Sequence, residues 1–296
     1  MLMHEATNMD QATGLRRMGA LRPVKVIAVS GGKGGVGKTN VSVNLAVAMA
    51  GLGRKVMLLD ADFGLANVDV LLGLSPEYDL SHLIRGERSL EEIIVEGPAD
   101  IRIIPASSGI GQMASLSPAE HAGVIRAFSE LSYELDVLIV DTAAGISDGV
   151  VSFCRASREV IVVVCDEPAS ITDAYAFMKV MNREFGVERF HVLANMVRTP
   201  REGRELYLKL SRAAERFLEI TPSYLGAIPH DERLRKAVQK QQAVVNAYPS
   251  SPSAVALKKV ARSIDEWPLA RQPGGQLEFF VERLIEAERE YAGAIP

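Results

Sequence analysis

The segment Gly32-Lys33-Gly34-Gly35-Val36-Gly37-Lys38-Thr39 fits the pattern G-x-x-x-x-G-K-[ST] and decides the fold of this chain. It follows an apolar run at residues 24–30 and precedes a helical pattern at residues 40–52, which is the context this pattern requires. Glycines let backbone N–H groups curl around phosphates, and the helix N-terminus adds partial positive charge. The sequence therefore predicts a phosphate-binding loop. Lys38 would reach the β- and γ-phosphates, and the Thr39 hydroxyl would bind Mg²⁺.

Short apolar runs alternate with longer amphipathic segments along the rest of the chain. The runs are continuous rather than alternating, which is typical of strands buried on both faces of a parallel sheet. The pattern predicts an α/β fold: a doubly wound, mostly parallel sheet of about seven to eight strands with helices on both faces. The expected strands are Val24–Ser30, Lys55–Asp60, Ile101–Pro105, Val137–Asp141, Val160–Cys165, His191–Asn195 and Tyr224–Ile228. The expected helices include Asn40–Leu52, Glu120–Tyr133, Ile171–Phe185 and Arg201–Phe217.

The composition excludes several classes of protein. The 296 residues are 48% hydrophobic and 24% charged, which excludes disorder, collagen and coiled coil as descriptions of the whole chain. A net charge of −4 argues against a globally basic nucleic-acid binder. Cys154 and Cys165 are too few for a disulfide scaffold and too far apart for a C-x-x-C metal site. We expect a cytoplasmic protein whose membrane contact, if any, is peripheral, because no apolar run approaches the roughly 20 residues of a spanning helix.

Two of the predicted strands end in carboxylates that suit magnesium chemistry. The run LLDAD at residues 58–62 ends the second strand, and LIVDTAAG at residues 138–145 ends in the pattern D-T-x-x-G. Asp141 sits where a carboxylate holds the water shell of Mg²⁺, and Gly145 lets the backbone approach the γ-phosphate. One interpretation of Asp62 is that its side chain caps the N-terminus of the helix that follows.

Lys33 is a second lysine inside the phosphate-binding loop. Within its own chain it would crowd Lys38 near one phosphate group, so a better use is to reach across a dimer interface to the partner's nucleotide. This lysine marks the deviant Walker A motif, and here the sequence resembles the MinD/ParA family of ATPases over nearly all of residues 23–267. The resemblance implies a homodimer that forms on ATP, with Mg²⁺ as cofactor and slow hydrolysis.

The same resemblance assigns roles to further residues. Asp62, the second aspartate of the D-x-D run, positions the attacking water, while Asp60 supports its loop. The expected catalytic residues are Lys33, Lys38 and Asp62, and the expected metal site comprises Thr39, Asp62 and Asp141.

The base pocket is expected at the ends of later strands. Asn195 matches the family asparagine that recognises adenine, and the run IPHDE at residues 228–232 resembles a segment that closes over the base. Pro229 is expected to stack on the base and Asp231 to contact it, with turn or helix-cap roles as the alternatives. Glu167 either approaches a ribose across the dimer or belongs to a simple turn. The expected cofactor-binding residues are Gly32, Lys33, Gly34, Gly35, Val36, Gly37, Lys38, Thr39, Asn40, Asn195, Pro229 and Asp231.

The flanks point to one branch of the family. The run DQATGLR at residues 10–16 resembles the D-Q-A-x-x-L-R element of the flagellar-number regulators, called FlhG or FleN. The resemblance implies that this element binds a flagellar GTPase of the signal-recognition-particle type. It also implies restraint of a transcriptional activator of flagellar genes, at the cell pole or the inner face of the membrane. The predicted organisation is a partner-binding segment at 1–22, an ATPase domain at 23–267, and a linker with an amphipathic helix at 268–296.

The final helix, expected at residues 276–291, leaves two uses open. Its apolar residues follow helical spacing, which suits burial against a membrane or a protein surface. Interfacial helices normally carry Lys and Arg on the polar face, whereas this stretch has a net charge of −3. Weak lipid binding and docking on the protein itself or on a partner therefore remain alternatives. The apolar stripe comprises Leu277, Phe280, Val281, Leu284 and Ile285.

Three other functions compete with the flagellar one. A ParA-type DNA-partition or cargo-positioning ATPase would use the basic residues of 198–216, although a solvated helix face explains them better and direct DNA binding is not expected. An iron–sulfur carrier needs more cysteine ligands than two distant thiols supply. The N-terminal D-Q-A run and the acidic final helix argue against a division-site regulator.

Overall fold

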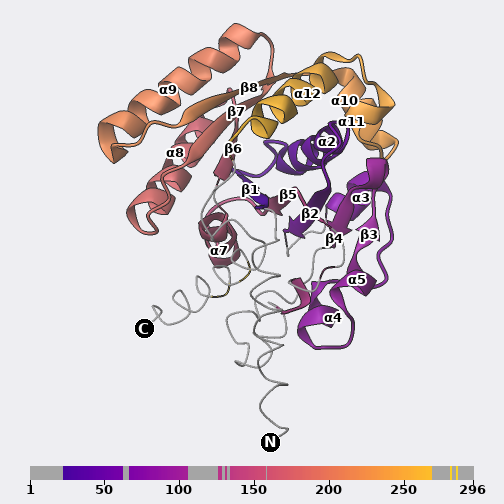
Figure 1. Cartoon of the computed structure of the whole chain (residues 1–296). Coiled ribbons are helices and arrows are strands. Elements are labelled where there is room, and N and C mark those ends of the chain that lie inside the picture. The colour runs from indigo at the N-terminus through magenta and orange to yellow at the C-terminus, as the bar shows by residue number, and fades with distance from the viewer. Residues whose placement is uncertain are drawn as a thin grey trace, which may run out of the picture.

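A computed structural model of the chain describes residues 23–62, 67–105, 126–128, 131, 134–157, 159–268, 281 and 285. Its described strands form one sheet of eight in the order β3-β4-β2-β5-β1-β6-β7-β8 (Figure 1). All neighbouring strands are parallel except β3 and β4. The strands are β1 (Lys25–Ser30), β2 (Val56–Ala61), β3 (Val95–Glu96), β4 (Arg102–Ile104), β5 (Val137–Thr142), β6 (Glu159–Cys165), β7 (Phe190–Val197) and β8 (Ser223–Pro229). The predicted sheet is confirmed, and the antiparallel β3 is an addition to it.

Helices cover both faces of the sheet (Figure 1). Successive strand residues alternate between the faces: Ile27 packs in one buried cluster, and its neighbours Val26 and Ala28 pack in two others. On the Ile27 face lie α2 (Lys38–Ala50), α3 (Val68–Leu72), α10 (Glu232–Gln239), α11 (Val244–Ala247) and α12 (Pro252–Asp265). On the other lie α4 (Leu80–Ile84), α5 (Leu90–Ile93), α7 (Asp148–Ala156), α8 (Pro168–Arg183) and α9 (Pro200–Leu218).

The helix expected at residues 120–133 lies outside the described residues except at 126–128, which are helical, and at 131. No helix in the described part of the chain is both long and apolar enough to cross a membrane.

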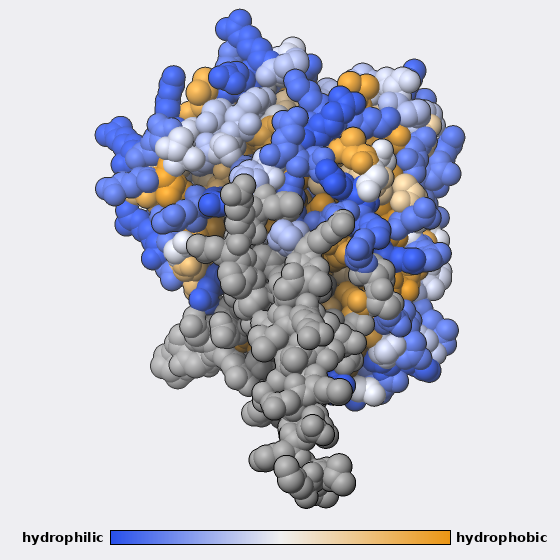
Figure 2. All heavy atoms as spheres, viewed as in Figure 1, coloured by the Kyte–Doolittle hydropathy of each residue, from blue (hydrophilic) through white to orange (hydrophobic). Residues whose placement is uncertain are grey.

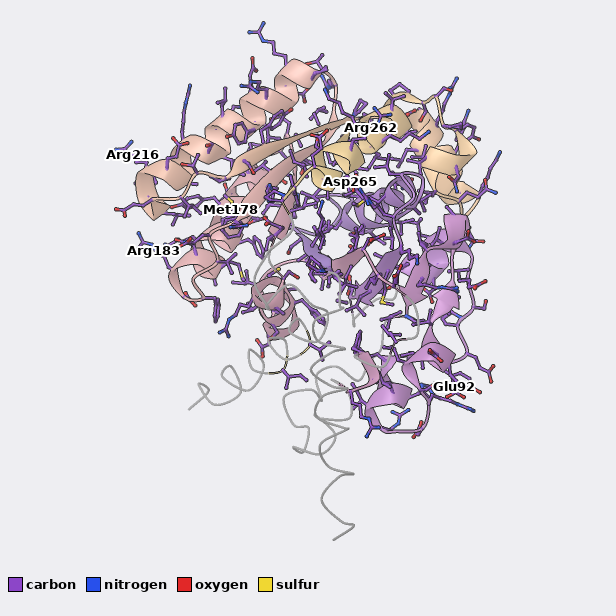
Figure 3. All side chains as sticks on the ribbon, in the orientation of Figure 1. Glu92, Met178, Arg183, Arg216, Arg262 and Asp265 are labelled. Carbon is purple, nitrogen blue, oxygen red and sulfur yellow. The ribbon has the colours of Figure 1, made fainter. Side chains whose placement is uncertain are left out.

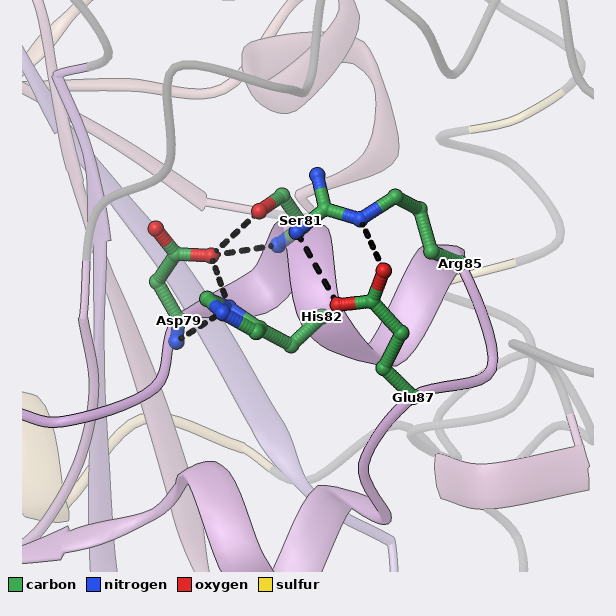
Figure 4. Close-up of polar contacts among 5 residues, drawn as sticks. All are labelled: Asp79, Ser81, His82, Arg85 and Glu87. Carbon is green, nitrogen blue, oxygen red and sulfur yellow. Dashed lines mark hydrogen bonds and ion pairs between the residues drawn. The ribbon is translucent and has the colours of Figure 1, made fainter.

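The short helix α4 is held by side-chain contacts at its start (Figure 4). The Asp79 carboxylate accepts a hydrogen bond from the Ser81 backbone N–H at 2.9 Å, and the Asp79 N–H donates to Nδ1 of His82 at 3.3 Å. This reciprocal cap supplies partners that so short a helix cannot find within itself. The inward residues Leu80, Leu83 and Ile84 complete a buried cluster with the sheet.

The carboxyl end of α12 is fixed to the strand edge opposite the phosphate-binding loop. Lys25 Nζ donates to the Ile264 carbonyl at 2.9 Å, and Arg54 binds the Asp265 carboxylate with two hydrogen bonds of 2.6 and 2.9 Å. Asp265 and Arg262 lie on this last turn (Figure 3). Trp267 then stacks on the His191 ring with 4.0 Å between centroids. The carboxyl end of α12 and Trp267 are therefore held to β1, β7 and the segment before β2.

Large apolar side chains are exposed at scattered places. In the view of Figure 2 hydrophilic side chains cover most of the described surface, with smaller hydrophobic areas between them. Singly exposed apolar residues of this kind are normal in a folded protein. The exposed large hydrophobic residues of the described part are Leu52, Val70, Ile146, Met196, Leu208, Phe217 and Val255.

Two residues of the predicted final helix belong to the core. Val281 and Ile285 are helical, 1% and 0% exposed, and are buried in the same cluster as Leu59, Leu80 and Leu83. Their spacing of four residues places them on one face of a helix. These two positions support docking on the protein's own body, one of the two uses left open by the sequence.

We predict that Val281→Ala with Ile285→Ala lowers the melting temperature of the protein with neither lipid nor nucleotide present. Truncating a buried Ile to Ala costs about 2–5 kcal/mol, which is several degrees in a domain of this size. Thermal unfolding followed by circular dichroism measures the effect, with the exposed Val255→Ala as matched control. Equal melting temperatures for the double variant and the control would contradict the docking of this face.

Candidate functional site

The phosphate-binding loop lies between β1 and α2, at the carboxyl edge of the sheet. Gly37 is the N-cap of α2 and has a φ of 89°, in the left-handed region that favours glycine. Gly32 has a different reason: a Cβ there would lie 2.1 Å from the Asp173 carbonyl oxygen of α8. The loop can therefore pass α8 only with glycine at 32 and turn into α2 most easily with glycine at 37.

The two lysines of the loop have different surroundings. Lys38 is 8% exposed, and burial lowers its pKa, opposed by the charges of Asp141 and Asp62. The Lys33 amine instead lies 2.9 Å from Oε2 of Glu167, the N-cap residue of α8, and its side chain is 40% exposed. Lys38 is thus the buried cation of its own loop, whereas Lys33 faces outward.

Asp141 is the most deeply buried carboxylate of the site. Its Oδ1 accepts a hydrogen bond from the Ser42 hydroxyl at 2.7 Å, while its Oδ2 is buried with no hydrogen-bond partner among the described residues. Burial raises the pKa of Asp141 to about 7, opposed by the Ser42 and Thr39 hydroxyls and by Lys38. An orphaned carboxylate oxygen beside a threonine hydroxyl is an environment that fits Mg²⁺, a cation that prefers oxygen ligands.

Asp60 shapes the segment that follows β2. Its Oδ1 accepts from the Asp62 N–H at 3.1 Å, and its Oδ2 accepts from the N–H groups of Asn67 and Val68, each at 3.2 Å. Burial raises the pKa of Asp60 to about 6, against these hydrogen bonds. Asp60 thus supports the loop as the sequence predicted. Asp62 is partly buried within electrostatic reach of Lys38.

A cavity of about 150 Å³ opens beside the phosphate-binding loop. At its wall, the Asn195 side-chain amide donates to the Val36 carbonyl at 2.8 Å, which ties the end of β7 to the loop. Met196 follows with a φ of 57°, where the register between β7 and β8 shifts. The lining residues are Gly37, Asn40, Val41, Asn195, Met196, Ile228, Pro229, His230, Asp231, Leu234, Arg235 and Leu257.

The predicted site residues therefore fall into two adjoining groups. Lys38, Asp62 and Asp141 meet at the loop, and Asn195, Pro229 and Asp231 line the cavity with Asn40. Lys33 stands apart from both groups. Sequence reasoning missed Ser42, whose place one helical turn after Lys38 is the only local signal for it. It also missed Met196, Arg235 and Leu257, which come to the cavity from distant segments.

Comparisons with known proteins agree with this geometry. Residues 23–265 match the family model ParA, described as NUBPL iron-transfer P-loop NTPase. The chain is 60% identical over 272 residues to the antiactivator FleN of Pseudomonas aeruginosa, covering 92% of this chain and 97% of that relative. It is 35% identical to the flagellum site-determining protein YlxH of Helicobacter pylori, over 80% of each chain.

Solved structures show the same architecture. The septum site-determining protein MinD of Pyrococcus horikoshii, complexed with Mg-ADP, matches with a TM-score of 0.65 and 25% identity. The match covers 82% of this chain and 96% of that structure.

The buried carboxylate predicts how stability depends on pH. Because the pKa of Asp141 is raised above its unfolded value, this group lowers the stability of the nucleotide-free protein as pH rises from about 4 to about 7. Asp141→Asn should therefore raise the melting temperature at pH 8, by an amount that grows between pH 4 and 7 and is constant above. The rise in melting temperature that added Mg²⁺ and nucleotide cause in the natural chain should disappear in Asp141→Asn.

Thermal melts across this pH range, with and without Mg²⁺ and nucleotide, measure both effects. The exposed Asp166→Asn serves as a control with the same change of charge. An Asp141→Asn variant less stable than the natural chain at pH 8 without ligand would refute the argument.

Proposed function

The chain belongs to the ParA/MinD family of P-loop ATPases, and from that membership we propose that it acts as an ATP-dependent dimerisation switch with slow hydrolysis. Two subunits close around two bound nucleotides, and hydrolysis resets them. ATP drives this step only as far as it binds the dimer more tightly than the monomer.

One observation carries the dimerisation proposal: the two loop lysines are separated in the single chain. Lys38 is buried at its own phosphate site, whereas the Lys33 amine lies at the surface against Glu167. Lys33 therefore does not compete with Lys38 within one subunit. An exposed lysine on the loop rim is placed to reach a phosphate on a facing subunit, and its ion pair with Glu167 is weak enough to break, since exposed pairs contribute about 0–1 kcal/mol.

The residues of the carboxyl edge divide the chemistry of hydrolysis. Mg²⁺ bound through Thr39 and the water shell at Asp141 would neutralise phosphate charge as it develops. Lys38 binds the β- and γ-phosphates, and Asp62 orients the attacking water. Asp60 holds the Asp62 backbone in place through its hydrogen bond. Asn195, Pro229 and Asp231 form the base side of the site, next to Gly37 and Asn40.

We propose control of flagellar number as the output of the switch. The support is the 60% identity to an antiactivator over nearly the whole of that relative, together with the match to a flagellum site-determining protein. The partners are a transcriptional activator of flagellar genes and a flagellar GTPase, the latter bound through residues 10–16, which lie outside the described residues. The protein works in the cytoplasm, at the cell pole or the inner face of the membrane, and any contact of residues 276–291 with lipid would require Val281 and Ile285 to leave the core.

Three of the basic residues of α9 make contacts within the protein, and its acidic residues reduce its net positive charge. Arg201 binds Glu205 at 2.8 Å, Lys209 lies 4.0 Å from Asp166, and Arg204 lies over the Tyr224 ring. We therefore assign α9 no DNA-binding role.

Sedimentation with and without ATP tests the switch. Lys38→Ala should weaken ATP binding at least about tenfold, because it removes a charge-assisted contact to phosphate. Lys33→Ala should still bind ATP but remain monomeric. Asp62→Ala should bind ATP and accumulate as a dimer, because a water-orienting group acts mainly in the transition state. Lys55→Ala, far from the loop, is the control.

Two results would contradict the roles proposed for Lys33 and Asp62. Normal ATP-driven dimerisation of Lys33→Ala would remove the trans role of that lysine. Normal turnover of Asp62→Ala would move the positioning of water to another group.

Removing residues 1–22 separates the ATPase from its GTPase partner. ATP binding and dimerisation should be unchanged, because β1 begins only at Lys25. Stimulation of the flagellar GTPase should be lost. A GTP-hydrolysis assay with both purified proteins decides it, and full stimulation by the shortened chain would reduce the segment to a tail.

A further inference from the structure

The turn after β8 is tied to the start of a helix more than twenty residues away. Asp231 Oδ2 accepts hydrogen bonds from both the backbone N–H and the hydroxyl of Ser253, at 3.0 and 2.7 Å. Its Oδ1 accepts from the Arg233 N–H at 2.9 Å and so caps α10. Both carboxylate oxygens of Asp231 are thus used inside the protein.

The partner of Asp231 is a buried polar group with little freedom. Ser253 and Ser251 are each 0% exposed, and their hydroxyl oxygens are 3.3 Å apart. Ser251 is the N-cap of α12, where its hydroxyl accepts from the Ala254 N–H. The amino end of a helix favours a nearby negative charge, and the pKa of Asp231 is lowered by these hydrogen bonds against the effect of burial. A buried network of this kind holds its members in one geometry.

The tie joins two elements that line the nucleotide cavity. Ile228 and Pro229 line it from the end of β8, and Leu257 lines it from α12. Ser253 lies one helical turn before Leu257 on α12 and is not itself among the lining residues. The hydrogen bonds of Asp231 therefore fix the position of Pro229 relative to Leu257.

We propose that Asp231 and Ser253 are positioning residues for the base: the hydrogen bonds between them set the spacing of Pro229 and Leu257, with Asp231 lining the cavity and Ser253 lying outside its lining. Asp231 thus acts through Ser253, while the choice of adenine stays with Asn195. The inference rests on the nucleotide site of the proposed function, and not on dimerisation or on the flagellar partners.

Steady-state kinetics of Ser253→Ala, Asp231→Asn and the double variant test this role. We expect each single variant to raise KM for ATP about five- to tenfold with kcat nearly unchanged. The double variant should be no worse than the more affected single one, because both remove the same tie. Ser253→Thr, which keeps the hydroxyl, should restore the natural KM, and the exposed Ser250→Ala is the matched control.

Inorganic tripolyphosphate, which has phosphates but no base, separates this effect from general damage. Its inhibition constant should be the same in all variants, and the preference for ATP over GTP should not change. The proposal fails if Ser253→Ala leaves KM unaltered, if tripolyphosphate binding weakens in parallel, or if Asp231→Asn alone changes the ATP/GTP preference. Failure of the natural chain to bind ATP would instead refute the nucleotide site itself.

Discussion

The burial of Asp141 beside Lys38 is the electrostatic constraint around which the site is built. The Asp141 carboxylate, near the carboxyl end of β5, is removed from water, and this burial raises its pKa to about 7. Burial shifts the pKa of Lys38 in the opposite direction and lowers it. Each charge partly offsets the desolvation of the other, and the Ser42 hydroxyl supplies one hydrogen bond. What remains without a hydrogen-bond partner among the described residues is Oδ2 of Asp141, an oxygen of the kind that Mg²⁺ prefers as a ligand.

The sheet makes this arrangement possible because its parallel strands all end at the same edge. Asp60 and Asp141 are register partners on β2 and β5, so their carboxylates meet without any loop to bring them together. The Asp60 carboxylate accepts hydrogen bonds from the backbone N–H groups of Asp62, Asn67 and Val68. The same edge thus carries three carboxylates: Asp60 holds the backbone, Asp141 keeps one buried oxygen without a partner among the described residues, and Asp62 lies within electrostatic reach of Lys38.

Much of this could be predicted from the sequence because the signals are local. Continuous apolar runs identified seven of the strands, and the loop pattern with its two aspartates identified the phosphate side of the site. Strand β3 escaped because it has two residues, one of them Glu96, and no period to detect. The stripe containing Val281 and Ile285 was evident, but its burial partners on β2 and α4 are distant in sequence.

Asp231 shows the same limit at the level of one side chain. The family resemblance gave it contact with the base, with a helix cap as the alternative; it lines the cavity, caps α10 through Arg233, and also binds Ser253. No local pattern reports a hydrogen bond across 22 residues. Ser251 and Ser253 could be read only as a helix start, which they also are.

Hydrogen bonds hold α12 at both of its ends, so that the helix moves as one rigid body. Its amino end is bound through Ser253 to the base cavity, and its carboxyl end through Lys25 and Arg54 to the opposite edge of the sheet. A helix of 14 residues is about 21 Å long and tilts as a rigid strut. Movement of one end of α12 would therefore be transmitted to its other end. There Trp267 stacks on His191, at the point where the chain leaves toward residues 281 and 285.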